Sequence, residues 1–234
     1  MSQVCITKHL KLPFQFDEKQ LLSDLDKVLE KEWKDHFNQR VYSGDWKSIA
    51  LYAPNGNPND IFASRAEPAP IMPTMFLSDC EYFQKVFAHF KCELLSVRLL
   101  NLGPGSYIKP HRDHDLGYEN GCFRLHIPIK TNPNVEFILG DVLLPMKPGE
   151  CWYTNVNYEH SVVNRGNTDR VHLIIDGQRN EWSDALFFAL ASKESLLTLE
   201  PITYDENTMA QIIQELEYTK PEGYQQIIND MKSR

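Results

Sequence analysis

Between residues 93 and 176, short runs rich in β-branched and aromatic residues alternate with clusters of Gly, Pro, Asn and Asp. This close punctuation leaves no room for the crossover helices that join parallel strands. The pattern therefore predicts an antiparallel sandwich or barrel. The eight runs are ELLSVRLLNL, SYIKPH, CFRLHIPI, VEFIL, DVLLP, ECWYT, HSVVN and RVHLIID.

Helical patterns flank the β-rich segment on both sides. Apolar residues recur at helical spacing over 17–33, and a second helix is expected over 78–90 with Ser78 as its N-cap. Residues 45–53 read as a strand. Further helices are expected at 181–191, 207–218 and 224–231. We therefore expect an N-terminal helical and strand region (1–93) that packs on the core and contributes a strand to it, a β-rich core (94–178) and a C-terminal helical extension (179–234).

Charge and composition argue against several classes of partner. The formal net charge is -8 and the basic residues are scattered, so no basic stripe is available to follow a nucleic acid. The first residues lack the apolar stretch of a signal peptide, and no window approaches the roughly 18 apolar residues of a membrane helix. Five cysteines without a CxxC motif argue against a disulfide framework and a thiolate zinc site. We expect a soluble cytoplasmic protein that binds neither nucleic acid nor membrane, and whose oligomeric state is open, with a homodimer as one option.

The segment KPHRDHD (109–115) concentrates imidazoles and carboxylates within seven residues. In a strand, His111 and Asp113 project to the same side, whereas Arg112 and His114 point to the other. One His-x-Asp pair is thereby singled out as half of a metal site. The segment is also polar enough to be a solvated strand end, and both interpretations stay open at this point.

Two other metal sites fit this segment poorly. Pro110 and Gly117 bracket it and oppose a zinc-binding helix, and no glutamate follows His111 as it does in metalloproteases. A calcium loop that began at Asp113 would need a bidentate glutamate at its twelfth position, where Arg124 stands.

A third ligand must come from a distant segment, and His160 is the best candidate. It opens a short run directly after a loop, about fifty residues beyond the first pair, where a jelly roll folds later strands beside earlier ones. Two histidines and one aspartate in this arrangement form the facial triad of non-haem iron oxygenases, which leaves three coordination positions open. These positions suit the 2-oxo acid end of 2-oxoglutarate and O2. Arg170, on the next run, could pair with the far carboxylate of that cosubstrate.

The chain from residue 44 to 176 resembles the aspartyl/asparaginyl β-hydroxylase family, a branch of the Fe(II)- and 2-oxoglutarate-dependent dioxygenases, and is also similar to bacterial free-proline hydroxylases. The motifs that carry the resemblance are GDW (44–46), PHRD (110–113), FRLHIPI (123–129), GECW (149–152), EHSVVN (159–164) and RVHLIID (170–176). The resemblance implies a double-stranded β-helix (jelly-roll, cupin-like) core, mainly β with flanking helices. It also implies iron ligation by His111, Asp113 and His160, and 2-oxoglutarate contacts from Trp46, Arg124, His126 and Arg170.

The chain departs from part of the family at two positions. Vertebrate-type members lack the triad carboxylate that Asp113 supplies here, and Leu100 stands where those members have a cosubstrate-binding serine. Asp113 places the chain nearer the small-molecule hydroxylases, whereas Leu100 removes the cosubstrate contact that the serine would make. The implied activity is hydroxylation of a free amino acid, or of an aspartyl/asparaginyl-type residue in a short peptide, with formation of succinate and CO2. Loops 66–74 and 116–121 are where we expect substrate selection.

Alternatives remain for the protein and for individual residues. A metal-binding cupin-like sensor or structural module, or an interaction module with a merely polar surface, would use the same sequence without oxygenase activity. Arg124 could pair with nearby acids, His126 and Trp46 could be ordinary core residues, and His172 is expected to be structural. The C-terminal helices would form a packing layer or an oligomer face.

Overall fold

The computed structural model describes residues 5–31, 33–36, 40–62 and 69–199, and its elements belong to one compact unit, Met1–Thr198. No helix among these residues has the length and apolar character needed to cross a membrane. The expected helices at 207–218 and 224–231 lie outside the described residues. The elements are β1 (His9–Gln15), α1 (Glu18–Leu29), β2 (Lys34–Asp35), β3 (Tyr42–Ser43), β4 (Trp46–Pro54), β5 (Ile71–Pro73), α2 (Glu81–Phe87), β6 (Leu94–Leu102), β7 (Tyr107–His111), β8 (Cys122–Lys130), β9 (Val135–Leu139), β10 (Val142–Leu143), β11 (Glu150–Thr154), β12 (His160–Asn164), β13 (Arg170–Gln178), α3 (Glu181–Phe188) and α4 (Lys193–Leu197), with short 3-10 turns at Met75–Leu77 and Tyr118–Asn120.

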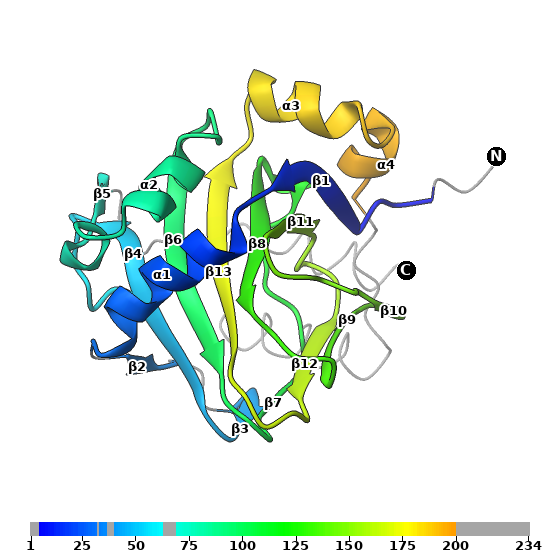
Figure 1. Ribbon diagram of the computed structural model, residues 1–234. Helices are drawn as coiled ribbons and strands as arrows, with labels where there is room; N and C mark the ends of the chain where they lie inside the picture. Colours follow the sequence, from blue (N-terminus) through cyan, green and yellow to red (C-terminus); the bar gives the residue numbers. More distant parts are fainter. Residues whose placement is uncertain (1–4, 32, 37–39, 63–68, 200–234) are drawn as a thin grey trace, which may run out of the picture. The chain divides into compact units, whose positions relative to one another are not determined.

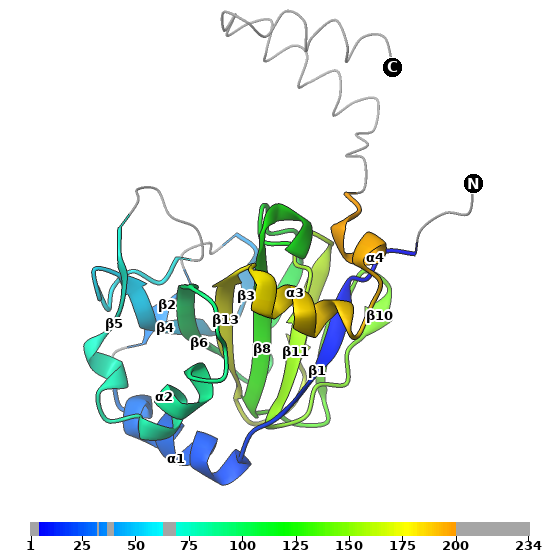
Figure 2. The same ribbon diagram turned by 90° about the horizontal axis from the view of Figure 1, so that it is seen from above.

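The strands form two antiparallel sheets that enclose the interior of the molecule (Figures 1 and 2). The larger sheet has eight strands in the order β1-β11-β8-β13-β6-β4-β2, with β5 paired to β4. The smaller sheet has five strands in the order β10-β9-β12-β7-β3. Most neighbouring strands, apart from β9 and β10 and from β4 and β5, are separated by other strands in the sequence, as in a jelly roll, and the expected mainly β fold with flanking helices is confirmed. The region before residue 94 supplies β1, β2, β4 and β5 to the larger sheet.

Side chains on the two faces of the central strands of the larger sheet belong to two separate cores. On β13, Val171, Leu173 and Ile175 pack against the helices in an outer core, whereas Ile174 belongs to an inner core between the sheets. The same alternation on β8 turns Leu125 outward. Because side chains alternate faces along a strand, the polar residues of β8 and β13 that separate these apolar residues face the space between the sheets. A polar lining is thus placed inside the molecule.

Helices α1 and α2 cover the outer face of the larger sheet (Figure 1). The start of α2 corrects our expectation of an N-cap at Ser78, since that residue has helical backbone angles at the end of the preceding 3-10 turn. The carboxylate of Asp24, on α1, accepts hydrogen bonds from the backbone N–H groups of Tyr82 and Phe83 at 2.7 and 2.9 Å. The first turn of α2 is therefore capped from a neighbouring helix, which a local sequence pattern does not reveal.

Strand β1 was not predicted. It pairs with β11 at the edge of the larger sheet, and Leu12 is the only residue of the strand that is buried. Leu10, Leu12 and Phe14 alternate with other residues as in a half-buried strand, but the internal proline, Pro13, counts against a strand in sequence-based prediction.

Candidate metal centre

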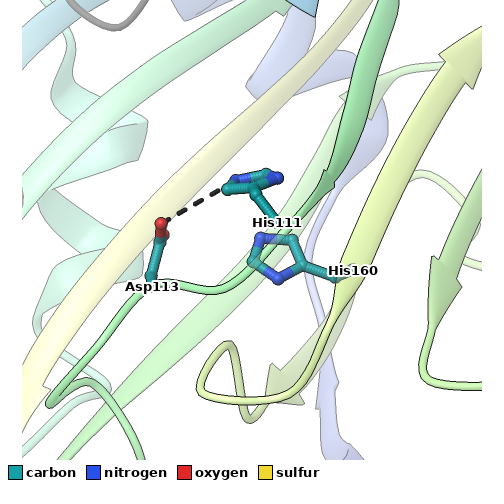
Figure 3. A group of neighbouring side chains, drawn as sticks. All are labelled: His111, Asp113 and His160. Atoms are coloured by element: carbon teal, nitrogen blue, oxygen red, sulfur yellow. Dashed lines mark ion pairs between the residues drawn. The ribbon is translucent and has the colours of Figure 1, made fainter. Parts of the chain in front are cut away.

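His111, Asp113 and His160 lie close together where β7 ends and β12 begins, in the smaller sheet (Figure 3). His111 ends β7 and is the register partner of His160 at the start of β12, so the two rings lie 4.2 Å apart between centroids. Asp113 follows β7 directly, where its N–H donates to the carbonyl of Val156 at 2.9 Å. One ligand atom from each of the three residues lies within 4.8 Å of the others. The structure therefore brings the predicted triad together. Arg112 and His114 are exposed, but both also line the cavity beside the triad.

Main-chain carbonyls fix the tautomer of both histidines. Nδ1 of His111 lies 2.8 Å from the carbonyl oxygen of Lys109, and Nδ1 of His160 lies 3.0 Å from that of Tyr158. A carbonyl oxygen only accepts, so each Nδ1 carries the proton and donates it. Each Nε2 is then left with its lone pair, which is the form in which imidazole binds a metal.

Charge in the cluster favours a metal-binding protonation state. Burial alone would raise the pKa of Asp113, but the Arg124 guanidinium and the two neighbouring histidines outweigh it and lower that pKa to about 2. Burial lowers the pKa of His160 to about 4. The carboxylate is therefore ionised and the His160 imidazole neutral at neutral pH. Two imidazoles and one carboxylate suit Fe(II) or a similar divalent ion.

Arg124 is held by two carboxylates. Its Nη1 donates to Oδ2 of Asp113 at 2.6 Å, while its Nε and Nη2 donate to the two oxygens of Asp176 at 2.7 and 3.2 Å. Oδ2 of Asp176 also accepts hydrogen bonds from Nη2 of Arg98 at 2.9 Å and from Oγ of Ser96 at 2.8 Å. Three of the five N–H donors of Arg124 are thus in use. The cosubstrate contact that the resemblance implies for this arginine stays a prediction.

Arg170 is the most isolated charge in the interior. Its side chain is 2% exposed, and no ion pair joins it to an acidic residue within the described ranges. Nη2 lies 2.9 Å from Nδ1 of His172, and the guanidinium carbon lies 5.8 Å from the centroid of the Phe137 ring. Burial lowers the pKa of Arg170 to about 9, so the group is still cationic at neutral pH. A buried cation without a counter-charge is costly unless an anion joins it.

A cavity of about 280 Å³ connects these residues. It is lined by all seven side chains that the sequence singled out: Trp46, His111, Asp113, Arg124, His126, His160 and Arg170. Both ring nitrogens of His126 and Nε1 of Trp46 are buried without a hydrogen-bond partner among the described residues. Unused polar groups of this kind are satisfied when a polar ligand enters.

A glycine turn places Trp46 in the cavity wall. β3 belongs to the smaller sheet and β4 to the larger one, so the chain crosses between the sheets at residues 44–45. Gly44 has φ +88°, and a Cβ at this position would lie 2.4 Å from Oγ of Ser106. That hydroxyl oxygen accepts the N–H of Asp45 at 2.7 Å. Glycine is required here, and Trp46 opens β4 directly after the turn.

Sequence reasoning missed other residues of the site. His36 lies outside the β-rich segment, yet β2 pairs with β4 and brings it to the cavity, where its ring stacks on Trp46 with 3.5 Å between centroids. Nothing in the spacing of the sequence points to this contact. Arg98 also lines the cavity, and Asp176 lies behind it. Arg98 and Asp176 are charged residues within largely apolar strand segments, and this pattern is the signal that could have pointed to them.

Comparisons with known proteins agree with this geometry. Residues 15–180 match a family model described as aspartyl/asparaginyl beta-hydroxylase. An L-proline cis-3-hydroxylase of a Streptomyces species is 24% identical over 205 residues, covering 83% of this chain and 71% of the relative. An L-proline cis-4-hydroxylase of Rhizobium meliloti (strain 1021) is 27% identical over 174 residues, covering 73% of this chain and 61% of the relative. A solved 2OG-Fe(II) oxygenase family oxidoreductase from Burkholderia pseudomallei shares the fold with a TM-score of 0.50 at 14% identity, covering 74% of this chain and 88% of that one.

Proposed function

Because the chain belongs to the aspartyl/asparaginyl β-hydroxylase family, we propose that it uses Fe(II), 2-oxoglutarate and O2 to hydroxylate a free amino acid, with succinate and CO2 as the other products. The protein is an amino-acid-hydroxylating enzyme of the dioxygenase type. The proposal concerns its cofactors, the roles of its side chains and the class of its substrate.

His111, Asp113 and His160 would hold the iron. The metal, when bound, supplies the oxidative chemistry that no amino-acid side chain provides. The chain itself contributes the orientation of its ligands: the backbone carbonyls of residues 109 and 158 fix the histidine tautomers, and Arg124 keeps the Asp113 carboxylate ionised. Three protein ligands would leave coordination positions of the metal free for the cosubstrate and O2.

The isolated cation at Arg170 is the observation that carries the cosubstrate assignment. It lines the same cavity as the triad and has no carboxylate partner in the described part of the chain. A dicarboxylate that reached the metal with one end would bring its other carboxylate to this guanidinium, where a charge-assisted pair forms away from water. His126 and Trp46 would orient the cosubstrate between the two points through their unused N–H groups.

The opposite part of the cavity suits a small amino acid. Arg98 and Leu102, the register partner of Arg170, are four residues apart on β6, which is about 13 Å at about 3.3 Å per residue. Nε of Arg98 is buried without a hydrogen-bond partner among the described residues, so it is available for the carboxylate of a substrate. Two relatives are named as hydroxylases of L-proline. Free L-proline is therefore the first substrate to test, ahead of a peptide residue.

The test is a screen of free amino acids with protein reconstituted anaerobically with Fe(II) and 2-oxoglutarate. We expect a visible charge-transfer band before oxygen is admitted. Afterwards, succinate formation should be stimulated by one or a few amino acids, each recovered with one added oxygen atom. Stimulation only by an aspartyl or asparaginyl peptide would refute the free amino acid as substrate. Metal binding without any turnover would instead favour the cupin-like sensor.

A further inference from the structure

We propose that Asp176 is a positioning residue that orients the metal-binding carboxylate of Asp113 through the guanidinium of Arg124. The inference deepens the proposed function, since it rests on the metal site at Asp113. Asp176 itself is not among the ligands and lies at the far end of β13 from Arg170. Its influence on the site has to pass through the side chains between them.

Asp176 is a fixed anchor. It is 1% exposed and lies on a central strand, where its register partners are Ser96 on β6 and Arg124 on β8. Four hydrogen bonds hold its two oxygens, two from Arg124, one from Arg98 and one from Ser96. A buried carboxylate bonded on both oxygens has no freedom to rotate, so it defines the plane of any group that pairs with it side-on.

The guanidinium of Arg124 transmits this orientation to the ligand. Its Nε and Nη2 face Asp176 as a planar fork, which turns Nη1 toward Asp113. Nη1 bonds Oδ2 of Asp113 at 2.6 Å, whereas Oδ1 is the oxygen that lies 3.7 Å from Nε2 of His111. One oxygen is thus held by the arginine and the other is presented to the metal position. Lysine would keep the charge but not this planar arrangement.

The charge balance predicts what happens without Asp176. Arg98 and Arg124 face Asp176 and Asp113, so two cations meet two anions in a buried cluster. With asparagine at position 176, Arg124 would lose its side-on partner and could turn its fork onto both oxygens of Asp113. It would then compete with the metal for Oδ1. Metal affinity should fall even though every ligand is present.

The experiment compares Asp176→Asn with Asp24→Asn in the full chain. Asp24 is a matched control, because it is 2% exposed and bonded to two backbone N–H groups and a lysine, but lies on α1. The dissociation constant for Mn²⁺ is measured by titration without cosubstrate, together with the thermal midpoint of the metal-free protein. We expect Asp176→Asn to raise the Mn²⁺ dissociation constant about 10- to 100-fold, as removal of a group that orients a ligand does. Asp24→Asn should lower the thermal midpoint and leave the Mn²⁺ dissociation constant unchanged.

A double-variant cycle tests the route through Arg124. If Asp176 acts through this arginine, Asp176→Asn should weaken Mn²⁺ binding no further in a chain that already carries Arg124→Met. Fully additive effects, or an unchanged Mn²⁺ affinity in a folded Asp176→Asn protein, would overturn the proposal. Should Asp176→Asn fail to fold, Arg124→Lys decides instead. It should raise the Mn²⁺ dissociation constant about 10-fold or more, and a wild-type value would reject the inference.

These outcomes separate this inference from the proposed function. A wild-type chain that binds no Mn²⁺ would remove the metal site and the inference with it. A wild-type chain that binds Mn²⁺ as tightly as the Asp176→Asn variant would remove the inference alone.

Discussion

Arg170, which we propose to bind the cosubstrate, has its charge in a destabilising position. In the absence of cosubstrate its charge is buried without an acidic partner in the described chain. Arg170→Met should therefore raise KM for 2-oxoglutarate by about 10- to 100-fold, the equivalent of a lost hydrogen bond to a charged group. It should also leave the thermal midpoint of the ligand-free protein unchanged or higher, since a buried unpaired charge is removed. Succinate assays and thermal melts measure both effects.

The control for Arg170 is Arg165, which forms a surface ion pair with Glu136 and is not among the residues that line the cavity. Arg165→Met should leave KM for 2-oxoglutarate unchanged. An unaltered KM in Arg170→Met would mean that the cosubstrate carboxylate binds elsewhere.

Alanine substitutions can distinguish the predicted ligand His160 from the exposed His114. His160→Ala should abolish stoichiometric binding of Fe(II) or Mn²⁺, because a buried Nε2 lone pair is lost from the cluster. His114→Ala should leave binding nearly intact, because that side chain is exposed and outside the triad. Metal analysis after dialysis measures the difference. The reverse result would show that the wrong histidine was chosen.

Buried neutral histidines predict acid sensitivity of the metal-free protein. Burial lowers the pKa of His160 to about 4, and it also lowers the pKa values of His126 and His172 well below the ordinary 6.5. In the unfolded chain these groups bind protons near pH 6.5, so the unfolded state takes up more protons below that pH. The free energy of unfolding should therefore decrease as pH falls from about 6.5 towards 4.

Urea titrations of the metal-free protein at several pH values check the acid sensitivity. The midpoint concentration should fall steadily over this window, and less steeply in His172→Gln. The pKa of Asp113 is shifted in the same direction, but its contribution falls in a lower pH window. Its pKa is lowered to about 2, so the stability that its ionisation contributes is present above pH 3.8 and lost only as pH falls towards 2. A midpoint that did not change between pH 6.5 and 4 would contradict the assigned protonation states.

At the scale of elements, strand alternation made most of the candidate site predictable. On β8, the alternation in CFRLHIPI separates Arg124 and His126 from the apolar residues of the other face, because successive side chains of a strand point to opposite faces. His36 and Arg98 could not be placed in this way. The first depends on the pairing of β2 with β4, and the second lies on β6, which has apolar residues on both faces.

Hydrogen bonds of Asn157 join the segment between β7 and β8 to the segment before β12, and substitution of Asn157 tests whether they shape the cavity. Oδ1 of Asn157 accepts the N–H of Leu116 at 3.2 Å, and its Nδ2 donates to Glu119 at 2.8 Å and to Asn120 at 2.6 Å. Leu116 lines the cavity. Asn157→Ala should loosen the cavity rim, raise KM for the amino acid several-fold and lower stability by about 1 to 3 kcal/mol.

The cosubstrate provides the internal control for Asn157→Ala. KM for 2-oxoglutarate should stay near the wild-type value, because Arg170 lies at the start of β13 and takes no part in the hydrogen bonds of Asn157. Equal rises in both KM values would point to a general collapse of the site, and no change in either would show that this fastening has no influence on binding.

At the scale of the whole molecule, ligand binding and folding are coupled. The metal and cosubstrate residues come from both sheets, so only the folded protein assembles the site. A ligand at about 100 times its dissociation constant stabilises the folded state by about 2.7 kcal/mol, which is several degrees in thermal midpoint for a domain of this size. Mn²⁺ with 2-oxoglutarate should therefore raise the midpoint measurably in the wild type. It should not do so in His160→Ala, and an equal rise in that variant would locate metal binding elsewhere.

The order of strands could be predicted from sequence more readily than their assembly into two sheets. Turn residues marked nearly every strand from β6 to β13, and the jelly roll followed from the resemblance. β1 and the cap that Asp24 provides to α2 were not foreseeable, because each depends on a partner that is remote in the chain. Local patterns specify elements, whereas such contacts are specified only by the complete fold.

The division of the buried apolar residues into two cores affects how the amino-acid sequence can change without loss of the fold. The outer core unites 27 buried residues and the inner core only 11 within the described chain, so most of the apolar packing is independent of the cavity wall. Point changes at inward positions of β4 and β6 can therefore accumulate without unravelling the domain. A mutant library confined to those positions should keep a large share of folded members, and new substrate preferences should be reachable from this chain in a few steps.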